Sequence, residues 1–157
     1  MAKIAFLVDV KDRDYMQNIV SEVENDGYDV MVYLYNGEDS FIKYLSRDEI
    51  DLLITFNCKG YEIPSLTGGV SLNFVNSKVL NVIYDKQFVE CSCIKKNPIS
   101  VSNFFYFEDA EVMEMYVQAY PHLPFVKLMK ECGTEKKTNG TILYNSICEV
   151  LKTCYLS

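Results

Sequence analysis

Hydrophobic and polar residues follow two different periods along the first half of the chain. Four short apolar runs have the length and composition of buried parallel strands: residues 3–9, 29–35, 51–57 and 79–84. Between these runs, apolar residues recur at helical spacing: Met16, Ile19, Val20 and Val23, then Phe41, Tyr44 and Leu45. This alternation of strand and helix predicts βαβ units with right-handed crossovers and a parallel sheet.

Turn and capping residues indicate where the first helix begins and ends. Asp12 or Asp14 is placed to cap its N-terminus, and Gly27 is placed to end it. Residues 86–102 show no clear period, and residues 131–140 are predicted to form a polar loop. The other elements expected in the second half are a strand at 103–107, a helix opened by Glu108 and Asp109, a short strand at 125–129, and a last helix with Leu143, Ile147, Val150, Leu151 and Cys154 on one stripe.

Together these elements predict an α/β fold, a Rossmann-like three-layer sandwich whose mainly parallel sheet has about six strands. The length of 157 residues suits a single domain over residues 1–157. No apolar run approaches the roughly 18 residues that cross a bilayer, and the start lacks the pattern of a signal peptide. We therefore expect a cytoplasmic protein that does not bind membranes.

The charge distribution changes the range of expected partners. The net charge is −7, and none of the 15 lysines and arginines belongs to a basic cluster. A surface that binds nucleic acid needs such clusters to displace counterions from phosphates. We therefore expect neither nucleic acid nor an anionic membrane as a partner.

The six cysteines show no CxxC spacing, and the only histidine, His122, lies between two prolines. A structural zinc site needs two close pairs of ligands, which the pair Cys91 and Cys93 does not supply. Free cysteines are ordinarily small buried hydrophobes, and without a secretory signal they stay reduced. The sequence predicts no metal site.

The loop after the first strand, residues 10–14, is acidic and contains no glycine. A dinucleotide or a flavin phosphate needs close approach to free backbone amides at that point. A P-loop and a nucleophile elbow are also missing from the sequence. We therefore predict no cofactor and assign no catalytic residue.

Polar residues follow several predicted strands at the edge where open α/β sheets bind ligands. The candidate ligand-binding residues are Asp9, Asp12, Asn57 and Asp85, with Gly68 and Gly69 in a loop where backbone could approach a ligand. One interpretation is a polar crevice for a small molecule at the carboxyl edge of the sheet. The other is that these residues are helix caps and turn residues, which strand–helix junctions need in any case.

One stretch of the chain resembles a known family. Residues 51–57 with Gly60, the run 82–85, and the segment 109–133 with its YPHLPFVKLM run are similar to the amino-terminal half-domain of spore-maturation-type and motility-associated GT-B glycosyltransferases. The resemblance covers about residues 45–133 and implies a Rossmann-like half-domain. In that family a second domain holds the nucleotide-sugar. The sequence departs from the family where Asp85 precedes Lys86 rather than a His-Pro pair, and where Leu128 precedes Met129 rather than Pro-His-Gly.

Three hypotheses about function follow. The first is a stand-alone module similar to a glycosyltransferase half-domain, which binds or interacts without catalysis and pairs with a second copy or another protein. The second is a degenerate receiver-like regulatory domain, because Asp9 and Asp12 follow the first strand and Asn57 stands where a phosphorylated aspartate is expected. The third is a small enzyme that uses Asp9, Asp85 or Cys58. The missing motifs favour the non-enzymatic hypotheses.

Overall fold

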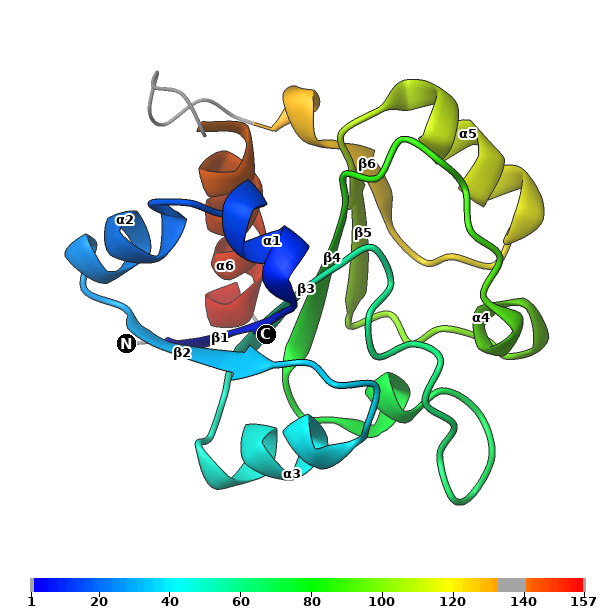
Figure 1. Ribbon diagram of the computed structural model, residues 1–157, viewed down its shortest axis with the longest axis horizontal. Helices are drawn as coiled ribbons and strands as arrows, with labels where there is room; N and C mark the ends of the chain where they lie inside the picture. The colour runs from blue at the N-terminus through cyan, green and yellow to red at the C-terminus, as the bar shows by residue number, and fades with distance from the viewer. Residues whose placement is uncertain (1, 133–140, 157) are drawn as a thin grey trace.

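The computed structural model describes residues 2–132 and 141–156. Its centre is a six-stranded sheet in the order β2-β1-β3-β4-β5-β6, and every neighbouring pair of strands is parallel (Figure 1). The strands are β1 (Lys3–Val8), β2 (Asp29–Leu34), β3 (Leu52–Phe56), β4 (Lys78–Ile83), β5 (Asn103–Phe107) and β6 (Val126–Leu128). The predicted α/β fold with a six-stranded parallel sheet is confirmed.

Helices cover both faces of the sheet, which makes the three layers of the sandwich (Figure 1). On one face lie α1 (Val10–Tyr15), α2 (Ile19–Asn25) and α6 (Thr141–Leu156); on the other lie α3 (Ser40–Arg47), α4 (Ser92–Lys96) and α5 (Ala110–Ala119). Two short 3-10 helices complete the elements, η1 (Ser71–Phe74) and η2 (Met129–Glu131). Each face of the sheet carries a hydrophobic core. Because successive strand residues point to opposite faces, Phe6 packs under α1, α2 and α6, and Leu7 packs under α3, α4 and α5.

Three local predictions need correction. The single helix expected after β1 is two helices, since Asn18 adopts a left-handed conformation with φ of 71° between α1 and α2. Asp9, rather than Asp12 or Asp14, is the N-cap of α1. The segment 86–102, which has no visible period, contains the short helix α4. Most of the predicted polar loop, residues 133–140, lies outside the described residues.

The strand order reverses direction beside β1. From β1 the chain moves to β2 on one side and then crosses to β3 on the other side. The connections that leave β1 and β3 therefore diverge, and this switch point is where open α/β sheets form their ligand crevice. It brings residues 9–12 and residues 57–59 to one edge of the sheet. Within the described residues, no helix is long and apolar enough to cross a membrane.

Candidate functional site

Asp9 and Asp12 hold each other in place at the start of α1. The Asp9 carboxylate accepts a hydrogen bond from the Asp12 amide at 3.0 Å, and the Asp12 carboxylate accepts one from the Asp9 amide at 3.1 Å. This reciprocal pair is a capping box, which satisfies amides that the first helical turn leaves without partners. The Asp12 side chain is completely buried. Both acids are therefore helix-capping residues, and they lie at the edge of the sheet where open α/β folds bind ligands.

Lys59 places a positive charge between the two carboxylates. Its Nζ atom lies 2.8 Å from Asp12 Oδ2 and 3.3 Å from Asp9 Oδ2, and it also donates to the Phe56 carbonyl at 3.3 Å. Partial burial of Asp9 opposes ionisation, but the Asp12 amide and the Lys59 ammonium outweigh it and lower the pKa of Asp9. The lysine thus offsets part of the negative charge of the two acids from within the fold. In residues 2–132 and 141–156 no group of three His, Cys, Asp or Glu side chains is placed to hold a metal ion.

Two stacked tyrosines close the cluster on another side. The Tyr84 hydroxyl donates to Asp12 Oδ1 at 2.7 Å, and its ring stacks on Tyr15 with centroids 3.9 Å apart. The Tyr15 hydroxyl in turn donates to Glu108 at 2.8 Å. Burial, followed by the adjacent carboxylate, raises the pKa of each tyrosine well above its usual value. Both phenols therefore remain protonated donors across the physiological pH range.

Asn57 ties the ends of β3 and β4 together. Its side-chain oxygen accepts hydrogen bonds from the amides of Tyr84 at 3.0 Å and Asp85 at 2.9 Å. Its backbone has a positive φ of 49°, which asparagine tolerates better than most residues. The Asp85 carboxylate points elsewhere and lies 3.5 Å from Lys11 Nζ in an exposed ion pair. The side chain of Asn57 is thus bound to the backbone of Asp85 and not to the Asp85 carboxylate.

Cys58 lies beside this tie but is not an activated nucleophile. Its amide donates to Asn81 Oδ1 at 3.0 Å, and its Sγ atom lies 3.3 Å from Asn81 Nδ2 and 3.8 Å from the Tyr116 hydroxyl. Although the residue is partly exposed as a whole, its thiol is enclosed, and burial raises its pKa to about 12. The thiolate that nucleophilic catalysis requires is therefore scarce at neutral pH.

Gly68 and Gly69 lie apart from the acids in a tight turn of the β3–β4 connection. The turn is closed by hydrogen bonds from Ser65 N to the Gly69 carbonyl and from Gly68 N to the Ser65 carbonyl, with a bridge between Pro64 and Val70. Both glycines have positive φ, as such a turn requires. No hydrogen bond or ion pair of the described residues joins this turn to Asp9, Asp12, Asn57 or Asp85.

The comparisons with known proteins do not identify a relative. No family model, curated protein or solved structure matches this chain. The site must therefore be interpreted from its own geometry. The sequence prediction missed the central cation of this site, Lys59, and both stacked tyrosines. The available signal for Lys59 was its position two residues after the predicted strand at 51–57.

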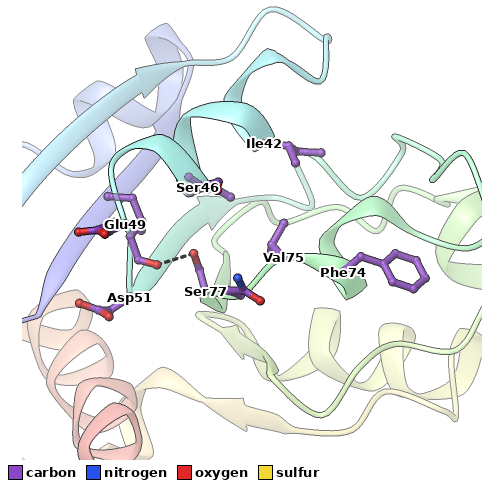
Figure 2. A pocket seen from close by; sticks show the side chains of 10 residues that line it. Ile42, Ser46, Glu49, Asp51, Phe74, Val75 and Ser77 are labelled. Carbon is purple, nitrogen blue, oxygen red and sulfur yellow. Dashed lines mark hydrogen bonds between the residues drawn. The ribbon is translucent and has the colours of Figure 1, made fainter.

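A concave region lies at the end of the sheet opposite to these acids, between α3 and η1 (Figure 2). The cavity has a volume of about 420 Å³, and Ile42, Leu45, Phe74 and Val75 supply apolar lining. Ser77 lies within it and donates a hydrogen bond to the Ile50 carbonyl at 2.7 Å (Figure 2). Glu49 and Asp51 are its only ionisable lining residues, so the cavity has room for a small molecule but no evident catalytic group.

Proposed function

We propose that this chain is a non-catalytic binding or interaction module, built on a half-domain similar to those of GT-B glycosyltransferases. The observation that carries the proposal is the Lys59 ammonium, held 2.8 Å from Asp12 and 3.3 Å from Asp9. Several carboxylates at the carboxyl edge of a sheet ordinarily serve a substrate or a bridging metal ion. Here the protein supplies the counter-charge itself, so the acids stabilise the fold.

The neighbouring residues support the same proposal. The side-chain oxygen of Asn57 accepts hydrogen bonds from two backbone amides, and the Tyr84 hydroxyl donates to Asp12. The Cys58 thiol has a pKa near 12, which removes the most obvious nucleophile. A nucleotide-sugar or a divalent cation entering this crevice would have to displace contacts that the folded chain already makes.

The direct test is a titration of the purified chain with Mg²⁺, UDP and GDP, together with an assay for transfer from UDP- and GDP-sugars. We expect no binding heat and no transfer by the wild-type protein. The Lys59→Met variant, which keeps most of the side-chain volume, should gain affinity for Mg²⁺ because it leaves two carboxylates without their cation. Tyrosine fluorescence offers a second readout, since the chain has no tryptophan. Sugar transfer by the wild-type chain would contradict the proposal, and nucleotide binding at this edge would contradict the structural role of the acids.

The strand order favours a second candidate function, a pseudo-receiver regulatory domain. The first five strands have the order 2-1-3-4-5, which is also the order of the flavodoxin-like and receiver folds. Acids follow β1 and Asn57 follows β3, but an amide cannot form an acyl phosphate. Incubation with acetyl phosphate and Mg²⁺ should leave the mass of the wild-type chain unchanged, and phosphorylation at Asn57 or its neighbours would exclude a phosphate-independent domain.

A further inference from the structure

Strand β2 is an open edge of the sheet. Among the described residues it pairs only with β1, from Lys3 opposite Asp29 to Val8 opposite Leu34. The Tyr35 amide donates to the Val8 carbonyl at 2.9 Å, so the odd-numbered residues of β2 direct their N–H and C=O groups toward β1. Backbone groups alternate sides along a strand. Those of Val30, Val32 and Leu34 therefore point away from the sheet.

The side chains of this edge are apolar and exposed. Met31 is 39% exposed, Val32 45% and Leu34 63%, although all three belong to a regular strand. The only charged residue of β2 is Asp29, at its beginning, and the strand contains neither proline nor glycine. Its register with β1 is continuous over six residues, without a bulge. Nothing in the strand itself prevents another strand from pairing with it.

The opposite edge of the same sheet is built differently. Strand β6 has only three residues, with Lys127 at its centre and Pro124 two residues before its start. Short strands, central lysines and nearby prolines are the devices by which proteins prevent edge-to-edge pairing. The protein thus protects β6 and leaves the longer, more apolar β2 open. This contrast leaves β2 as the edge of the sheet that is available to a partner.

We propose that the partner is a second copy of this chain, whose β2 pairs antiparallel with β2 across a twofold axis through Val32. In this register Val32 lies opposite itself, Val30 lies opposite Leu34 of the second copy, and Met31 lies opposite Tyr33. Every outward N–H and C=O group from Val30 to Leu34 then has a partner. All of the cross-strand pairs are apolar, and no like charges face each other. The two sheets become one continuous sheet.

Charges next to the strand favour the same arrangement. Arg47, at the end of α3, lies near the start of β2, where it lines a depression with Asp29 and Met31. The turn that follows β2 carries Glu38 and Asp39. Arg47 already pairs with Asp48 of its own chain at 2.9 Å, but 59% of its side chain is exposed, and antiparallel pairing brings it toward the acidic turn of the other copy. A twofold axis doubles every such contact, which makes the edge complementary to itself. This inference rests on the edges of the sheet and the charges beside β2, and it stands whether or not the carboxyl edge binds a ligand.

Sedimentation measurements on the wild-type chain and the Val32→Lys variant test the proposal. We expect the wild type to have twice the monomer mass of 18.1 kDa at micromolar concentrations. The variant should be monomeric, because it places two ammonium groups opposite each other on the axis. Val101→Lys is the matched control, since Val101 is 84% exposed but lies before β5, and it should remain dimeric. Circular dichroism establishes that each variant is folded.

Cross-linking locates the interface independently. Residues opposite each other in a hydrogen-bonded antiparallel pair have Cα atoms about 5.5 Å apart, within the range that a disulfide spans. Mild oxidation should therefore give a covalent dimer of Val32→Cys but not of Val101→Cys. A wild-type chain that stays monomeric overturns the proposal, including one that captures an extended peptide from another protein. A dimer that survives Val32→Lys and does not cross-link at position 32 also overturns it.

Discussion

The Nζ atom of Lys59 lies 2.8 Å from a carboxylate oxygen of Asp12, and the Asp12 side chain is completely buried. The two residues come from different strand connections, the first after β3 and the second after β1. Their contact therefore fastens the two sides of the topological switch point to each other. In related folds this is the place that opens to ligands. The same contact explains why a buried carboxylate is tolerated there, since its charge is paired and hydrogen-bonded.

Removing the cation should destabilise the protein strongly. Lys59→Met leaves Asp12 buried without its counter-charge, a change that costs about 3–5 kcal/mol of unfolding free energy. Urea denaturation followed by circular dichroism measures this loss. The double variant Asp12→Asn/Lys59→Met should recover part of it, because a neutral amide does not need the ammonium.

Lys11→Met is the matched control for this experiment. Its ion pair with Asp85 lies in solvent, with 60% and 37% of the two side chains exposed, so the loss should stay below about 1 kcal/mol. Equal effects of the two lysine substitutions would show that the Lys59 contact is an ordinary surface ion pair.

Substitutions of Asn57 should separate its two structural roles. Asn57→Ala removes the acceptor of two amides and places an alanine at positive φ, for an expected loss of about 2–4 kcal/mol. Asn57→Gly removes the same hydrogen bonds but adopts positive φ freely, so it should cost about 1 kcal/mol less. Thermal or urea unfolding measures both variants. Identical losses would mean that the backbone conformation carries no strain.

Cys58 should react slowly in the native protein. Because burial raises its pKa to about 12, only a very small fraction is thiolate at neutral pH. Mass spectrometry after limited iodoacetamide treatment should find Cys58 unmodified in the folded chain and alkylated in urea. Rapid native alkylation at this position, compared with the unfolded control, would reopen the hypothesis of a cysteine enzyme.

The stability of the protein should fall in acid partly through Asp48. Hydrogen bonds from Arg47 and then from Tyr33 lower the pKa of Asp48 from its usual 3.8 to about 2. The folded state therefore binds a proton less readily than the unfolded state. The stabilising contribution is complete above the unfolded pKa and is lost as the pH falls toward the folded value. Urea midpoints measured between these pH values should decline less steeply for Asp48→Asn than for the wild type. Parallel profiles would exclude a contribution from Asp48.

The inner strands β1, β3, β4 and β5 were predictable because each buries both faces and therefore forms a continuous apolar run. The period of 3.6 residues likewise located α3, α5 and α6. Local patterns did not reveal the break at Asn18, where the left-handed backbone separates α1 from α2. The short helix α4 was also missed, because five residues are too few to establish a period.

The candidate site was likewise predictable only in part. Asp9, Asp12, Asn57 and Asp85 were found from the sequence because the ends of parallel strands meet at one edge of a sheet. The sequence alone did not determine their partners. Tyr84 contacts Asp12 across 72 residues, and Lys59 contacts Asp12 across the switch point. Whether these acids form an open crevice or a closed network depends on where loop side chains point. Packing of the folded layers decides that direction, since residue spacing within any single segment carries no information about it.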